Sequence, residues 1–135
     1  MAVMRDRPYL GSRFLVDLGA GDSRGVAAGF CEVLLPTRRL AEGDAGLGVD
    51  TLVLRRGFTG ALDLHAWFGQ AQRGKAPKRR TVQVELLDDD GERVVATWRF
   101  RHARPVSLSY SPLQAMAPAV LVETVELAFD SVELS

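Results

Sequence analysis

The sequence predicts a mainly β fold, an antiparallel β-barrel or sandwich of six to seven strands with one packed α-helix. Apolar residues alternate in steps of two along most segments, and only one segment has the i, i+3, i+4, i+7 spacing of a helix face. Clusters of glycine, proline and aspartate separate the segments and predict turns. The 135 residues, 47% of them hydrophobic, are enough for one buried core, so we expect a single domain over residues 1–135.

The first half of the chain contains three predicted strands. Residues 13–18 and 26–35 flank a glycine-rich turn and are predicted to pair as a hairpin. Pro36 ends the second strand, because proline cannot donate to a strand ladder. Residues 36–49 mix charges with glycines, show little periodicity and predict an exposed loop. A third strand is predicted over residues 50–56.

The helix is predicted over about residues 61–73, which is followed by a basic linker, Lys75–Arg80. Asp63 falls in its first turn, where a negative charge meets the positive helix end, and Gly74 is placed as a left-handed stop. Its predicted core face consists of Leu64, Trp67, Phe68 and Ala71.

Period-two alternation returns after the linker, and Asp90-Gly91 predicts a tight hairpin turn. Pro105 is predicted to separate two strands. The last strand is apolar on both sides, which predicts burial on both faces or a partner subunit. The four strands are predicted over residues 81–86, 94–101, 106–110 and 120–129.

The sequence contains no recognisable set of catalytic residues. His65 and His102 lie on different elements, without cysteine or histidine at ligand spacing, so no metal site is expected. A Gly-x-Ser-x-Gly elbow is absent. Cys31, the one cysteine, lies in the middle of a predicted strand and is expected to be buried. We therefore expect no enzyme, no cofactor and no metal.

Seventeen basic and seventeen acidic residues give a formal net charge of zero. This balance argues against a general nucleic-acid binder and removes a self-repulsion that opposes association. The sequence has no apolar stretch of membrane-spanning length and no signal-peptide core, which predicts a cytoplasmic protein without a membrane anchor. The basic run Lys75–Arg80 leaves open a stand-alone β-barrel that binds nucleic acid or an acidic partner.

Eight segments, in this order, carry a resemblance to a known family. They are Ala28–Val33, Leu52–Gly60, Leu64–Phe68, Arg80–Leu87, Asp90-Gly91, Trp98–Arg101, His102–Val106 and Val122–Leu127. The first is similar to a Gly-Phe-x-Glu-Val strand and the second to a strand that ends in Arg-Gly-x-Thr. Over about residues 12–130 the chain resembles the inner tail-tube proteins of contractile bacteriophages and of extracellular contractile injection systems.

The resemblance implies hexameric rings in which the sheets of neighbouring copies join into one barrel around a channel. Rings would stack into a tube, and contraction of a surrounding sheath would drive this tube through the target envelope. The implied partners are further copies of the chain, sheath and baseplate proteins, and cargo in the lumen. Assembly would take place in the cytoplasm, before the protein becomes part of a phage tail or a released injection particle.

The segment between the first two matching strands is shorter than in the family and lacks a Tyr-Arg-x-Gly stretch that helps rings to stack. This departure leaves open a baseplate-proximal component that initiates or caps the tube. The residues nearest to a stacking role are Arg38, Arg39, Glu42 and Asp44. Polar positions that alternate with the predicted core are candidates for the lumen or the outer surface: Thr81, Gln83, Glu85, Thr97 and Arg99.

Overall fold

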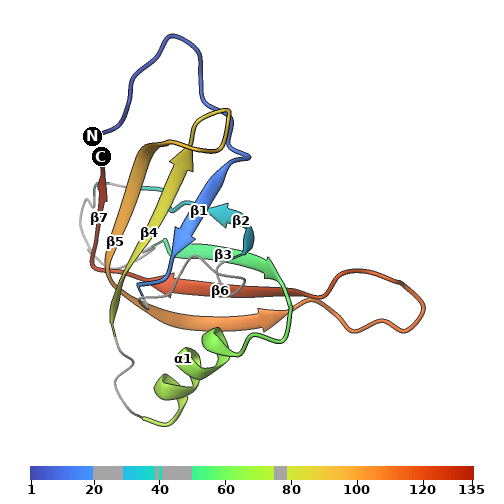
Figure 1. The fold of residues 1–135 in the computed structure, drawn as a ribbon. Coiled ribbons are helices and arrows are strands. Elements are labelled where there is room, and N and C mark those ends of the chain that lie inside the picture. Colours follow the sequence, from blue (N-terminus) through green and yellow to red (C-terminus); the bar gives the residue numbers. More distant parts are fainter. Residues whose placement is uncertain (20–28, 39, 41–49, 75–78) are drawn as a thin grey trace. The chain divides into compact units, whose positions relative to one another are not determined.

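A computed structural model describes residues 1–19, 29–38, 40, 50–74 and 79–135 (Figure 1). This part of the chain contains seven antiparallel strands and one helix, which confirms the predicted mainly β class. The elements are β1 (Phe14–Asp17), β2 (Phe30–Leu34), β3 (Leu52–Gly57), α1 (Asp63–Gln72), β4 (Arg80–Leu87), β5 (Val94–Tyr110), β6 (Val122–Ala128) and β7 (Ser131–Leu134).

The strands are hydrogen-bonded in the order β1-β4-β5-β6-β3-β2, with β7 also paired to β5. The chain divides into two compact units. The first unit contains the described residues of Met1–Gly29, Arg79–Ala103 and Phe129–Ser135, and the second contains those of Phe30–Lys78 and Arg104–Ala128. Strand β5 therefore contributes its first part to one unit and its last part to the other.

In the first unit, β4 pairs with β1 on one side and with β5 on the other. The predicted β4–β5 hairpin is confirmed, and Gly91 in its turn has a φ of +75° that favours glycine. Phe100 packs edge to face on Phe129, with ring centroids 5.0 Å apart. The buried apolar residues of this unit are Val16, Leu18, Val82, Val84, Val95, Phe100 and Ala103.

In the second unit, β3 pairs with β2 and β6, and β6 pairs with the last part of β5. The predicted helix is confirmed and buries Leu64 and Trp67, each 1% exposed. Gly74 follows it with a φ of +73°, as expected of a left-handed stop. The apolar core of this unit consists of Phe30, Leu52, Leu54, Leu64, Trp67, Val125 and Leu127.

Two predicted strand arrangements are wrong. Strand β1 pairs with β4, and β2 pairs with β3, so the two do not form the expected hairpin within the described residues. Pro105 does not separate two strands either, because β5 continues past it. Pro105 faces Leu127 and Ser107 faces Glu126, so Val106 is the extra residue of a bulge. Regular pairing with β6 continues after it. Strand β7 was not predicted.

Cys31 is exposed, which corrects the prediction of a buried side chain. The pairing shifts between Phe30, which faces Arg56, and Glu32, which faces Arg55. Cys31 is the extra residue of this bulge, and a bulge turns its extra residue out of the regular alternation. Its Sγ donates to the Arg55 carbonyl oxygen at 3.4 Å.

A second bulge bends β5 at His102. Arg80 faces Ala103 and Val82 faces Phe100, so one residue of β4 faces two residues of β5. His102 adopts a φ of +56°, which is costly for a residue with a Cβ atom. The imidazole Nδ1 lies 3.1 Å from an Asp130 carboxylate oxygen, and this contact holds the bend locally.

A pair of substitutions at His102 tests whether the bend requires this backbone conformation. His102→Val places a β-branched side chain at positive φ and is expected to lower the free energy of unfolding by about 1–3 kcal/mol relative to His102→Asn, which tolerates the conformation. Both variants lack the imidazole, so their difference isolates the backbone. Urea unfolding measures it, and equal stabilities would show that β5 relaxes without the left-handed residue.

Candidate functional site

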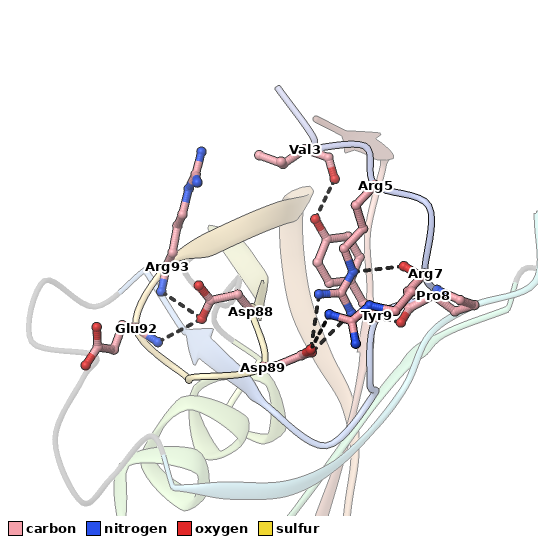
Figure 2. A network of polar contacts seen from close by, with 9 residues as sticks. All are labelled: Val3, Arg5, Arg7, Pro8, Tyr9, Asp88, Asp89, Glu92 and Arg93. Atoms are coloured by element: carbon pink, nitrogen blue, oxygen red, sulfur yellow. Dashed lines mark hydrogen bonds and ion pairs between the residues drawn. The ribbon is translucent and has the colours of Figure 1, made fainter.

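The N-terminal arm, residues 1–11, is tied to the β4–β5 turn by a polar clasp (Figure 2). The guanidinium of Arg5 donates through Nη1 and Nη2 to the two Asp89 carboxylate oxygens, at 3.2 and 3.1 Å. Arg5 also donates to the carbonyl oxygens of Arg7 and Pro8, each at 2.8 Å. One side chain therefore shapes the arm and fastens it to the turn.

The arm continues from the clasp to the edge of β5. The Arg5 guanidinium lies 3.9 Å from the centroid of the Tyr9 ring, whose hydroxyl donates to the Val3 carbonyl at 2.7 Å. The amide of Val3 donates to the carbonyl of Val95 on β5 at 2.8 Å. Ser135 exchanges two backbone hydrogen bonds with Thr97, so both chain termini pair with β5.

The electrostatics of the clasp are set mainly by one charged pair. The hydrogen bond from Arg5 holds the pKa of the Asp89 carboxyl below its usual 3.8 and raises the pKa of Arg5. A lowered folded-state pKa means that the contribution of this pair to stability is present above the usual pKa. It is lost as the pH falls through the lowered value. The clasp is therefore intact at neutral pH.

Asp89→Asn is expected to free the arm while leaving the body of the first unit folded. Hydrogen exchange of the N-terminal peptide, which contains the Val3 amide, should become faster at neutral pH. In the unsubstituted protein the same exchange should accelerate, beyond its intrinsic pH dependence, only when the pH falls below about 3.8. Asp90→Asn, at the exposed neighbouring position, is the matched control. Equal protection in both variants would contradict the clasp.

The second unit contains a buried ion network centred on Arg56 of β3. Its Nε donates to Glu123 Oε1 on β6 at 2.8 Å, and the side chains are 3% and 1% exposed. Its two terminal nitrogens donate to the carboxylate of Asp63 in the first turn of α1. The guanidinium also lies 5.3 Å from the centroid of the Phe30 ring. Arg56 thus connects β3, β6 and the start of the helix.

Burial by itself would lower the pKa of Arg56, but hydrogen bonds to Asp63 and Glu123 outweigh it and the pKa is raised. The guanidinium therefore stays charged in the core and requires its carboxylates. A buried charge that has lost its partner is far more costly than a pair removed together. The network consequently fixes how the helix starts against β3 and β6.

Glu123→Ala is expected to lower the free energy of unfolding by about 3–5 kcal/mol, because it removes a buried partner of Arg56. Glu126→Ala, on the same strand, removes a carboxylate that is partly exposed and accepts from Thr51 at 3.0 Å. This control should cost much less. Chemical unfolding compares the two variants. Similar losses of unfolding free energy would contradict a greater stabilising role for the buried network than for an exposed carboxylate.

The second unit also has an open groove of about 570 Å³ over β2, β3, β5 and β6. Arg55 and Glu32 form an ion pair of 2.6 Å along it, so its charges are paired internally. Its lining residues are Cys31, Glu32, Arg55, Ser109, Tyr110, Ser111, Val122 and Thr124. Nothing in this set resembles a nucleophile with its base.

Within the described ranges, no group of three or more His, Cys, Asp or Glu residues is placed to hold a metal ion. His65 is exposed on α1 and His102 contacts Asp130. No helix in the part of the chain that is described is long and apolar enough to cross a membrane.

The residues expected near a ring-stacking contact are described only in part. Arg38 is exposed, whereas Arg39, Glu42 and Asp44 lie outside the described residues, as does most of the expected loop. Their role in stacking stays a prediction.

Of the five positions expected to face the lumen or the outer surface, three are partly exposed and two are buried. Thr81, Gln83 and Arg99 are partly exposed, and their assignment stays a prediction. Glu85 and Thr97 face each other across β4 and β5 but are only 7% and 8% exposed, so neither lies on a surface of this chain. Val84, the residue before Glu85 on β4, is also buried and points to the opposite face. This part of β4 is therefore buried on both faces, which strict alternation does not predict.

Sequence reasoning missed both ion clusters. The buried network had a usable signal, because Arg56 continues the inward alternation of Leu52 and Leu54, and Glu123 begins that of Val125 and Leu127. Opposite charges at inward positions of two strands indicate a buried pair. The arm clasp had no such signal, since Arg5 and Asp89 are separated by 84 residues and lie outside any periodic pattern.

These features define a β-rich fold with one helix, and solved structures share this fold. A chain of the anti-feeding prophage baseplate, 6-fold symmetrised, matches with a TM-score of 0.78 and 25% identity, covering 97% of both chains. A chain of an extracellular contractile injection system, in its sheath/tube terminator, matches with a TM-score of 0.76 and 24% identity, covering 96% of this chain and 98% of that one. A chain of a PVC sheath-tube complex in the extended state matches with a TM-score of 0.74 and 23% identity, covering 95% of this chain and 91% of that one.

The model of the family described as T4-like virus tail tube protein gp19 matches residues 47–133. The chain belongs to this tail tube family, which confirms the resemblance found in the sequence. No match was found among curated proteins.

Proposed function

We propose that this chain is a structural subunit of the inner tube of a contractile tail or injection system. It would form hexameric rings that stack around a channel. The observation that carries the proposal is the tail tube family match over residues 47–133. The mechanism is mechanical, because the subunit transmits force through its contacts with its neighbours.

Open sheet edges support ring formation. In the described residues, β1 is bonded only to β4 and β2 only to β3, so each leaves one edge of its backbone without a strand partner. Pairing with a neighbouring copy satisfies such an edge, and a closed ring satisfies every copy equally. Leu15 on β1 and Leu34 on β2 are 37% and 44% exposed, so apolar surface would be buried along with these edges.

The proposed partners follow from the same assembly. A sheath would surround the tube and drive it through the target envelope by contracting, a baseplate would hold its end, and cargo would occupy the lumen. Arg38 or Arg39 would pair with Glu42 or Asp44 of the next ring and set the register between rings. The protein would assemble in the cytoplasm and then become part of the particle.

A second candidate is a baseplate-proximal component that begins or caps the tube. The observation that favours it is the short connection between β2 and β3, which lacks the Tyr-Arg-x-Gly stretch of stacking tube proteins. The similar structures come from a baseplate, a terminator and a sheath-tube complex, so their likeness supports both candidates.

Negative-stain microscopy of the purified protein, with light scattering on the same samples, tests the proposal. We expect rings of uniform diameter that stack into tubes as the concentration rises. Discrete rings that never stack would favour the baseplate-proximal component. A monomer of 14.7 kDa at high concentration and low salt would contradict ring formation by the protein alone. Salt-dependent capture of nucleic acid by that monomer would instead favour a binding module.

A further inference from the structure

The loop between β5 and β6, residues 111–121, projects away from its strands (Figure 1). We call it the apolar prong. Charged residues make up 25% of the chain, but the prong contains none. Leu113, Met116 and Val120 are 86%, 97% and 76% exposed. Large apolar side chains gathered on one exposed projection mark a contact surface.

Several contacts hold the prong in one shape. Where the prong leaves the strands, the Ser111 amide donates to the Val122 carbonyl oxygen at 2.9 Å. The Val122 amide donates to the Ser111 hydroxyl oxygen at 2.8 Å. Inside it, the Ala117 amide donates to the Gln114 carbonyl. Two prolines fix further φ angles. A loop ordered before binding loses less conformational entropy when it docks.

A second uncovered apolar surface lies where the prong starts. Phe58 and Tyr110 meet edge to face, with ring centroids 5.9 Å apart, and the Phe58 amide donates to the Leu121 carbonyl at 2.8 Å. We call Phe58 and Tyr110 the prong base. They remain 38% and 45% exposed, and the tip residues Leu113 and Met116 are almost fully exposed, so the tip does not cover its own base.

We propose that the tip of the prong packs on the prong base of a second copy of this chain. Both surfaces are apolar, and the prong offers no charge to a charged partner. Lasting contacts between identical chains are more apolar than transient ones. Tip and prong base are different surfaces, so the tip of each copy contacts the prong base of the next copy. Repeating this head-to-tail contact generates a ring or a stack. The inference rests on the proposed tube function and names the surface that joins the copies.

Cross-linking between two single-cysteine variants tests the contact. In a Cys31→Ser background, Ala115→Cys labels the tip and Thr59→Cys labels the base, and both substitutions leave the proposed contact residues in place. Both positions are exposed. A short bis-maleimide should join the two variants when they are mixed, and neither variant to itself. Gln72→Cys, exposed at the end of α1, replaces Thr59→Cys as the matched control and should give only background.

The outcomes separate this inference from the proposed function. Rings without cross-linked product would overturn the prong contact and leave the tube function standing. Cross-linking of Ala115→Cys to itself would also overturn it, because it shows tip against tip. Cross-linked pairs without rings would support the contact but contradict ring formation. A protein that neither assembles nor cross-links would contradict both.

A second measurement uses the assembly threshold. Met116→Ser removes an apolar side chain without adding charge, and should raise the concentration at which assemblies dissociate about tenfold or more. Gln114→Ser, on the same exposed loop, is the control and should leave that threshold unchanged. Equal thresholds for the two variants, measured by light scattering, would contradict a buried role for the tip.

Discussion

Strand β5 is the element on which the pairing of all other strands depends. It bonds directly to β4, β6 and β7, and the remaining strands reach it through these neighbours. Its ladders have register shifts near His102 and after Pro105, and the strand continues past both. The same 17 residues therefore contribute to both compact units.

Charge is used in two different ways around this strand framework. Arg56 is buried with Glu123 and keeps its charge because carboxylates from β6 and α1 surround it. The Arg5–Asp89 pair is partly exposed and fastens the N-terminal arm to the β4–β5 turn. The first arrangement fixes a core, whereas the second holds a segment that solvent conditions can release. The net charge of zero therefore gives no indication of these two specific ion pairs.

Much of the fold was predictable, because strand and helix periods are local properties of the sequence. The helix, its glycine stop and the Asp90-Gly91 hairpin all follow from nearby residues. The β1–β4 pairing and the path of β5 past Pro105 did not, since strand partners and bulges are decided by packing between distant segments. Cys31 shows the same limit, because one bulge reverses which face a side chain occupies. Of the candidate site, the burial of Glu85 and Thr97 depends on a second covered face that alternation cannot reveal.

Family membership, open sheet edges and an uncharged projecting loop support the proposal that copies of this chain contact one another. The central proposal to test is that this chain closes into a ring of six. Native mass spectrometry of the purified, assembled protein tests this most directly, by counting chains in each species. The account predicts species whose masses are multiples of six 14.7 kDa chains. A distribution confined to monomers, or one built on another repeat number, would contradict it.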